Sequence, residues 1–282
     1  MKAVRIFRDR ALLIGVVIIS CLVLVAVFAG PLSTYPDHVT GFDPNHRLTQ
    51  PGWQFLLGTD RMGADIYSRL LFGARLTILI SVIATATAVI IGVPIGLVAG
   101  YFDGWASEAL MRISDIFLAV PQIVLAIAIA QTLGPSIQNV ILALSATYWP
   151  FWARLVYAET RSQRNEIYVE AAKAMGASPL RIMALHILPN ISGSIIVRTT
   201  IGMGATILAA ASLGFLGLGA PPPAPEWGRM IAESREFLPK AWWYATAPGI
   251  AILMVVMGFN LMGDGLRDVL DPRLRRGGSD GK

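Results

Sequence analysis

The long apolar runs constrain this chain most, and the first of them is the simplest to interpret. Residues 11–30 contain no charged side chain. A helix of twenty residues is about 30 Å long, which matches the hydrocarbon core of a bilayer. A cleavable signal peptide has a shorter apolar core, of about 7–15 residues. The run therefore predicts an uncleaved first transmembrane helix, with the basic residues before it on the cytoplasmic side.

Further apolar stretches follow the first one. They cover residues 76–100, 113–133, 137–153, 195–219 and 243–262. Only 15% of the residues are charged, whereas soluble domains carry about 25%, so lipid is the natural solvent for much of the chain. With six spans, the arginines and lysines between positions 154 and 186 and those of the tail lie on one side. We predict an all-α, polytopic membrane protein with about six transmembrane helices and both termini in the cytoplasm.

Three glycines in the second apolar stretch predict a close helix contact. Gly92, Gly96 and Gly100 stand at every fourth position, and small residues at this spacing let two helices approach closely in lipid. Pro94 lies among them. A proline is tolerable there because neighbouring helices can satisfy the carbonyl group that it leaves free.

Three other local patterns carry structural expectations. The apolar positions within residues 64–75 predict a short helix that lies at the membrane interface. Residues 148–152 read Tyr-Trp-Pro-Phe-Trp, which predicts an aromatic belt at the end of a span. Arg198 lies in the fifth apolar stretch, at a place from which its side chain can reach the cytoplasmic surface.

The sequence lacks the residues that several kinds of chemistry require. The sequence has no GxxxxGK[ST] phosphate loop, so it cannot hold ATP in that way, and the energy source must be another polypeptide. Cys21, the one cysteine, cannot form an intrachain disulfide. The histidines fit no metal-binding spacing; they are His38, His46 and His186. We expect no metal and no cofactor on this chain, and no nucleic acid, since the net charge of +5 comes from basic residues that flank the spans.

The longest polar interruption between two spans, after the first external segment, covers residues 166–190. It begins with strong helix formers, and Gly176 follows them as a C-terminal cap, where glycine adopts a left-handed backbone at least cost. Ser178 and Pro179 then match the N-cap and first turn of a second helix, which ends near Pro189. The segment predicts two helices joined by a sharp glycine turn on the cytoplasmic face.

The same segment carries a family resemblance. The residues concerned are Glu170, Ala171, Ala172, Gly176, Leu188 and Pro189. Together they resemble the EAA signature of the permease subunits of ABC importers. His186 stands where the general pattern has an aliphatic residue, and in this respect the chain is similar to the dipeptide, oligopeptide and nickel branch. Further blocks that resemble this branch lie at residues 57–70, 100–105, 215–219 and 260–268.

The resemblance implies a type I ABC importer permease fold. It implies an N-terminal helix with an external segment at residues 1–73, a permease core at 74–272 and a cytoplasmic tail at 273–282. The helices near residues 164–189 are then coupling helices, which dock in a groove of a separate ATPase subunit. The implied partners are a paralogous permease, two ATP-binding subunits that use ATP and Mg²⁺, and an external solute-binding protein.

The resemblance also implies a function and a place for it. The function is ATP-driven import of dipeptides or oligopeptides by alternating access across the cytoplasmic (inner) membrane. Nickel or another small solute is the alternative cargo, because selectivity is largely set by the binding protein. A self-sufficient channel or secondary carrier is the second alternative, although the spans have almost no charges away from their ends, where an ion route would need them. A membrane enzyme has no constellation of residues behind it.

Four charged residues near the second span form an external block. They are Asp60, Arg61, Asp65 and Arg69. Their alternating charges predict a salt-bridged cap at the interface, and this is the interpretation we favour. The alternative is a contact surface for the solute-binding protein.

Overall fold

The computed structural model describes residues 9–270 of the chain. Within them every regular element is a helix, apart from one isolated β-bridge between Thr59 and Asp65, so the all-α prediction is confirmed. The basic N-terminal residues Lys2, Arg5 and Arg8 and the predicted tail at 273–282 lie outside the described residues.

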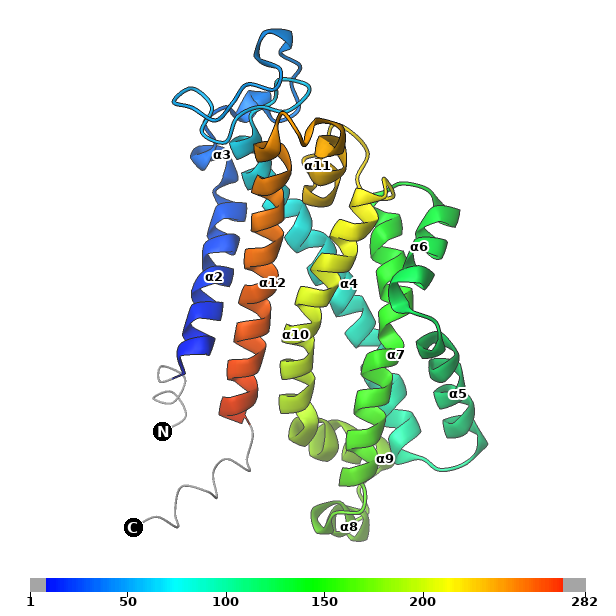
Figure 1. Ribbon diagram of the computed structural model, residues 1–282. Helices are drawn as coiled ribbons and strands as arrows, with labels where there is room; N and C mark the ends of the chain where they lie inside the picture. The colour runs from blue at the N-terminus through cyan, green and yellow to red at the C-terminus, as the bar shows by residue number, and fades with distance from the viewer. Residues whose placement is uncertain (1–8, 271–282) are drawn as a thin grey trace.

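The helices form an elongated bundle whose two ends differ in character. Its helices are α2 (Arg10–Val27), α3 (Ala29–Leu32), α4 (Ile66–Tyr101), α5 (Trp105–Ala119), α6 (Gln122–Leu133), α7 (Ile137–Gln163), α8 (Ile167–Ala174), α9 (Pro179–Arg181), α10 (Leu188–Phe215), α11 (Trp227–Ser234) and α12 (Trp242–Leu270). The start of α2 and the end of α12 lie at the same end of the bundle as α8 and α9 (Figure 1). The segment between α3 and α4 lies at the opposite end, together with α11.

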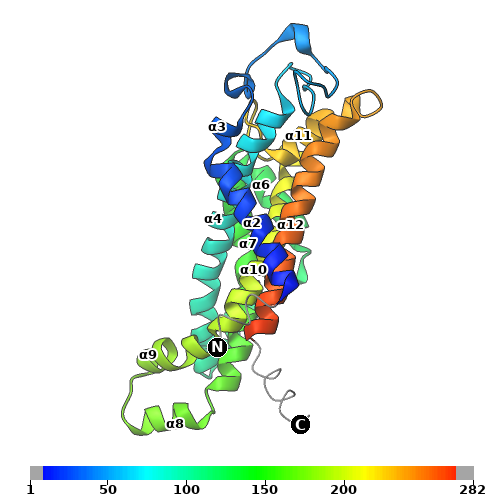
Figure 2. The ribbon, with the colours of Figure 1, turned by 90° about the vertical axis from the view of Figure 1, so that its left-hand side faces the viewer.

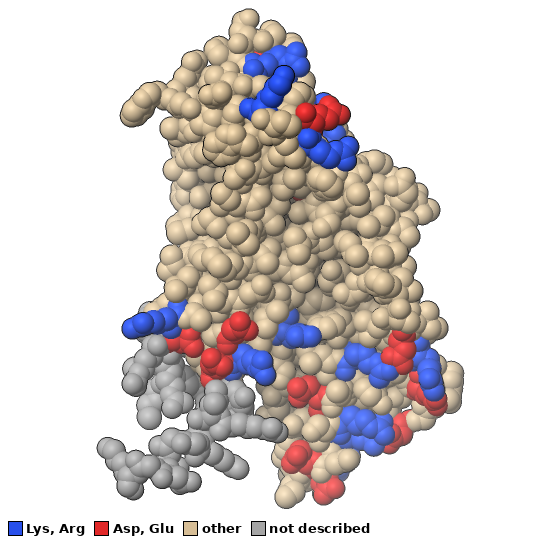
Figure 3. All heavy atoms as spheres, in the orientation of Figure 1, with Lys and Arg blue, Asp and Glu red and all other residues tan. Residues whose placement is uncertain are grey.

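Several of these helices can cross a membrane. Among the described residues, α2, α4, α12 and the stretch Pro179–Phe215, which ends with α10, are long and apolar enough to do so. The bent pair of α5 and α6 adds a fifth crossing if it is counted as one broken span. α7, with 27 residues, packs along α4 but is less apolar and is not among the candidate spans. On the face drawn in Figure 3, a belt without charged side chains separates two charged zones, as a multi-pass membrane protein requires.

The predicted glycine contact is present and joins α4 to α7. A Cβ atom built on Gly92 would lie 2.5 Å from the carbonyl oxygen of Trp149, and one on Gly96 would lie 2.5 Å from that of Ala153. Gly100 meets α7 one turn further on, at a similar separation. No side chain fits at these positions, so the backbones of the two helices touch directly. The contact uses dispersion and close backbone approach, which stabilise helix pairs in lipid, where no hydrophobic effect drives them together.

The predicted interfacial helix at residues 64–75 is wrong, because residues 66–75 are the first turns of the long helix α4. The helix begins after Asp65, whose carboxylate accepts hydrogen bonds from the backbone N–H of Ser68 (3.0 Å) and from its hydroxyl (2.6 Å). It then continues without a break to Tyr101. Its charged residues find partners inside the protein: the Arg75 guanidinium donates to the carbonyl oxygens of Ala26 and Val27, which end α2. With these charges satisfied, nothing separates the first turns from the span.

The stretch at residues 113–133 is not one continuous helix. α5 ends at Ala119 and α6 begins at Gln122, and their axes are bent by 88°. Pro121 causes the break, because a proline has no N–H for the helix and restricts the residue before it to an extended conformation. Val120 has that conformation, with φ −93° and ψ 135°.

The prediction that residues 148–152 form an aromatic belt at the end of a span is also wrong. These residues lie inside α7, which continues beyond them to Gln163. Trp152 is only 1% exposed and donates a hydrogen bond from Nε1 to the hydroxyl of Thr199 on α10 (3.1 Å). The cluster therefore joins α7 to α10 inside the bundle, since close contact with α4 buries this face of the helix.

Candidate functional site

The segment between α7 and α10 projects beyond the bundle at the end where the described chain begins and finishes. Figure 2 shows α8 and α9 standing out from the remaining helices. They are joined by a turn at Gly176, where φ is +80° and an added Cβ would meet no atom outside the turn within 4 Å. Glycine is favoured here for its backbone conformation alone, because the space beside it is open.

Local hydrogen bonds make this turn a Schellman motif, as the C-cap prediction required. The N–H of Ala177 donates to the carbonyl of Ala172 (3.0 Å), and the N–H of Gly176 donates to that of Lys173 (2.9 Å). These bonds satisfy carbonyl groups that the end of α8 would leave free. On the other side of the turn, the hydroxyl of Ser178 accepts from the N–H of Arg181 (3.4 Å) and so caps α9.

The second helix does not end before the next span, contrary to the prediction. A π-helical stretch, Ile182–Ile187, connects α9 directly to α10. Its wider register appears in the bond from the N–H of Leu188 to the carbonyl of Met183, five residues back. This register carries the helix past Pro189, which has no N–H to offer and would interrupt an ordinary α-helical pattern. α9, the π-helical stretch and α10 therefore follow one another without a break in the helical backbone.

The predicted signature residues divide between two surfaces of this segment. Ala172 is 1% exposed and lies in a buried layer between the two limbs and the bundle. The layer consists of Leu97, Val156, Val169, Ala172, Ile182, Met183, Ile187 and Ile191. Glu170, Ala171, Gly176 and Pro189 are exposed, and Leu188 is half-buried. Glu170 makes no ion pair with another described residue.

Four exposed apolar side chains on the same segment, together called the apolar ridge, were not among the residues predicted from the sequence. The ridge consists of Ile167 (82% exposed), Met175 (81%), Leu180 (74%) and Leu185 (62%). These side chains lie on or beside α8, α9 and the π-helical stretch, whose opposite faces are buried. A signal was present in the sequence, since these large side chains occur in a polar segment where no span could bury them.

Charge pairs fasten the base of the segment to the end of α4. The guanidinium of Arg164 lies 2.8 Å from the carboxylate of Asp103 and donates to the carbonyl of Tyr101 (3.3 Å), and Arg161 lies 3.5 Å from the same carboxylate. The hydrogen bond from Arg164 lowers the pKa of Asp103 from its ordinary value. Lys173 on α8 lies over the ring of Tyr101, 5.6 Å from its centroid. These contacts attach the projecting segment to the end of α4.

The external block contains part of the predicted salt-bridged cap: Asp60 pairs with Arg69, whereas Asp65 caps a helix and Arg61 is partly exposed. Asp60 is 0% exposed and Arg69 is 4% exposed, and the two form an ion pair. The carboxylate of Asp60 also accepts from the N–H groups of Met62 (2.7 Å) and Ala64 (2.9 Å). Asp65 is buried as the N-cap of α4.

Two residues far along the sequence complete this network. The carboxylate of Glu233 lies 3.5 Å from Arg69 and 3.8 Å from Arg61, and the hydroxyl of Tyr244 donates to it (3.0 Å). The network therefore ties the start of α4 to α11 and α12. Arg61, with 41% of its side chain exposed, is the only member of the predicted block that solvent reaches freely.

Another buried carboxylate lies between α10 and α11. Glu226 is 4% exposed and caps α11, accepting from the N–H groups of Gly228 (2.8 Å) and Arg229 (2.9 Å). A Cβ atom on Gly214 would lie 1.9 Å from this carboxylate, so only glycine fits beside it. Burial raises the pKa of Glu226 to about 7. No local pattern in the sequence marks this site, because its parts come from two separate helices.

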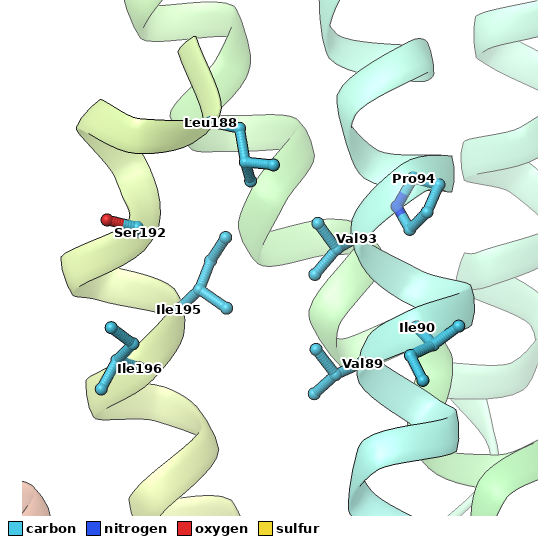
Figure 4. A pocket seen from close by; sticks show the side chains of 8 residues that line it. All are labelled: Val89, Ile90, Val93, Pro94, Leu188, Ser192, Ile195 and Ile196. Carbon is cyan, nitrogen blue, oxygen red and sulfur yellow. The ribbon is translucent and has the colours of Figure 1, made fainter. Parts of the chain in front are cut away.

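Two cavities between the helices differ in their lining. One, of about 400 Å³, lies between α4 and α10 and is almost wholly apolar (Figure 4); its side chains are Val89, Ile90, Val93, Pro94, Leu188, Ser192, Ile195 and Ile196. The other has a volume of about 1050 Å³ and lies among α7, α10 and α12, with polar and charged residues in its wall. Among residues 9–270, no group of three or more His, Cys, Asp or Glu side chains is placed to hold a metal ion.

Comparisons with known proteins agree with this architecture. The family described as binding-protein-dependent transport system inner membrane component matches residues 92–276. The dipeptide transport system permease protein DppC of Alkalihalophilus pseudofirmus is 45% identical, over 95% of this chain and 88% of its own length. The di/tripeptide transport system permease protein DppC of Pseudomonas aeruginosa is 41% identical, over 95% of this chain and 90% of its own length.

A solved structure extends the agreement to the fold. A chain of the MetNI methionine ABC transporter, in inward facing conformations, superposes with a TM-score of 0.59 at 21% sequence identity. The match covers 72% of this chain and 97% of that one, which is a likeness of fold. The resemblance found in the sequence is confirmed, and the chain belongs to the family of binding-protein-dependent transport system inner membrane components.

Proposed function

We propose that this permease imports dipeptides or oligopeptides in an ATP-driven ABC transporter. In this transporter it pairs with a paralogous permease, two ATP-binding subunits and an external solute-binding protein. The cargo is supported by the relatives, which are named for the transport of dipeptides, of di- and tripeptides and, at 40% identity in Pectobacterium atrosepticum, of glutathione. Nickel remains the alternative cargo.

The observation that carries the coupling role is the apolar ridge on a rigidly held segment. Burying a large aliphatic side chain stabilises a contact by about 1.5–3 kcal/mol, so several exposed ones on one projecting segment favour a protein partner. Their own chain leaves them exposed, while the buried layer and the pairs with Asp103 fix the segment to α4 and α7. A surface of this kind suits docking to an ATPase subunit and the transmission of its movement.

The proposed orientation places this end of the molecule in the cytoplasm. Basic residues gather there, in the segment itself and at the end of α12, which agrees with the excess of arginine and lysine on the inner side of membrane proteins. Both ends of the described chain lie at the same end (Figure 1). The external block then faces outward, and Arg61 is its member best placed to meet a binding protein.

ATP and Mg²⁺ belong to the partner subunits in this proposal. The sequence has no phosphate loop, and the projecting segment offers a surface for a protein, with no glycine-rich loop for phosphate groups. The chain would contribute the path and the mechanical connection, and the ATPase would contribute the energy.

The test uses the whole transporter purified with its ATPase. The double variant Met175→Ala/Leu180→Ala should reduce both the amount of ATPase that co-purifies and the ATP-driven uptake of a dipeptide into liposomes. Trp105→Ala is the matched control, because Trp105 is 84% exposed on α5 outside the segment. Full coupling in the double variant would refute the docking role. Dipeptide flux through this chain alone, without ATP, would support the self-sufficient channel instead.

A further inference from the structure

The larger cavity is an open cleft with several charged side chains in its wall. It is lined by Arg154, Glu159 and Phe151 of α7, by Ser194 and Arg198 of α10 and by Arg267 of α12. Arg198 stands ten residues into α10, which places it about 15 Å along the helix from Leu188. Its side chain is exposed to the space of this cleft, as expected for a charged group in a span, which is costly unless it faces water or a partner.

The charges in this cavity differ in whether their own chain satisfies them. Arg154 is paired, since its Nε lies 2.8 Å from the carboxylate of Asp115. Arg198 has no carboxylate partner among the described residues; its guanidinium lies over the ring of Phe151, 4.4 Å from the centroid. The stacking orients the guanidinium and leaves its N–H donors free for another acceptor.

An unpaired acidic group shares the cavity with Arg198. Glu159 is half-buried in the same wall, about one and a half turns beyond Arg154 on α7, and forms no ion pair with a described residue. Arg198 and Glu159 are opposite charges that face one space without pairing with each other, and Arg267 adds a further cation to the wall. Such a space suits a ligand that carries both signs. A peptide with free ends is such a ligand, because its terminal ammonium and carboxylate lie at opposite ends of the chain.

We propose that this cavity is a binding chamber on the peptide's path, in which Arg198 binds the peptide's terminal carboxylate and Glu159 its ammonium group. The inference rests on the proposed import of peptides. The planar fork of an arginine matches a carboxylate with two parallel hydrogen bonds, and the ring of Phe151 holds that fork in place. The apolar cavity of Figure 4 lacks charged groups, so it cannot act in the same way.

The test labels one introduced cysteine in the complete transporter, held in nanodiscs without nucleotide. Cys21→Ser removes the native thiol, and Ser194→Cys places a new one in the cavity wall. The rates of reaction with an anionic and a cationic methanethiosulfonate reagent are then compared. With Arg198 present the anionic reagent is favoured, and Arg198→Gln should lower the anionic-to-cationic ratio by about threefold to tenfold. Arg112→Gln is the control, because Arg112 pairs with Glu108 on α5, outside the cavity.

The peptide itself provides the second measurement. Alanyl-alanine should slow the labelling of Ser194→Cys, and its C-terminal amide should protect much less. Arg198→Gln should remove the difference between the two, and Arg198→Lys should keep part of it. Equal protection by both peptides, or a difference that survives Arg198→Gln, would overturn the proposal.

Other occupants of the cavity give different results. If the labelling ratio follows the content of phosphatidylglycerol in the nanodisc and ignores the peptide, the cavity holds a lipid headgroup and the proposal is wrong. If the assembled transporter blocks labelling altogether, the paralogous permease covers this wall, and the proposal is wrong as well. ATP-driven uptake of alanyl-alanine by the unmodified transporter is measured beside these arms. Its absence would refute the proposed function, whereas intact uptake without differential protection would refute the chamber alone.

Discussion

Gly96 gives the sharpest test of how the two central helices are held together. Its missing side chain lets α4 lie against the backbone of α7: an added Cβ would be 2.5 Å from the carbonyl oxygen of Ala153 and 2.8 Å from the Cβ of Val156. Ordinary contacts begin near 3.4 Å, so Gly96→Ala requires the helices to separate by close to 1 Å at this point. Neither atom can move aside, because the oxygen belongs to the backbone of α7 and the Cβ of Val156 is attached directly to that backbone.

Two effects of opposite sign decide the magnitude. Overpacking a tight interior costs about 1–3 kcal/mol, while replacing a glycine inside a helix by alanine gains about 0.5–1 kcal/mol. The overpacking term is larger, so we expect Gly96→Ala to destabilise the protein by up to about 2.5 kcal/mol. The loss should grow with Gly96→Val, whose branched side chain also meets Val156.

A matched control separates the contact from the change of residue. Gly249 lies inside α12 with no atom within 4 Å of an added Cβ, so Gly249→Ala should keep or raise the stability. Thermal unfolding of the purified chain in one detergent, followed by tryptophan fluorescence, compares the two variants with the original. If Gly96→Ala unfolds at the same temperature as Gly249→Ala, the close contact of α4 and α7 does not stabilise the folded protein.

Three further predictions concern the ends of the bundle. The pKa of Glu226 is raised from 4.5 to about 7, so the carboxyl group binds its proton more tightly in the folded state than in the unfolded state. The free energy of unfolding should therefore fall by about 3 kcal/mol as the pH rises from 4.5 to 7. Glu226→Gln should remove this pH dependence from the melting temperature. Gly176→Ala should keep most ATP-driven uptake, because the only cost of an alanine there is its left-handed backbone, about 1–2 kcal/mol. Gly176→Pro should abolish uptake, because proline lacks the N–H that donates to the carbonyl of Lys173. Equal uptake by the two variants would contradict this reasoning. Arg69→Gln leaves Asp60 buried without its cation and should cost about 3–5 kcal/mol, seen as a loss of folded protein that Asp60→Asn partly restores.

The candidate site was predictable only where its parts are close in sequence. The glycine turn and its cap were predictable because the bonds join residues three to five positions apart. The unbroken passage from α9 into α10 was not, since a proline normally signals an end and only the π-helical register avoids it. The apolar ridge was visible as residue types, but its exposure depends on how the two limbs pack on the bundle.

The amino-acid sequence by itself determined the features that depend on near neighbours and on the solvent. Apolar runs require lipid, and lipid requires helices, because backbone groups have no water to bond there. The spacing of Gly92, Gly96 and Gly100 predicts that another helix packs closely on this surface, but it does not indicate which helix. Tertiary structure decided which groups meet across long separations: Arg69 with Glu233, Glu226 with Gly214, and Arg198 with a cavity where it has no carboxylate partner among the described residues. Such pairings depend on how whole helices stack, and the pattern of any one helix fits several neighbours equally well.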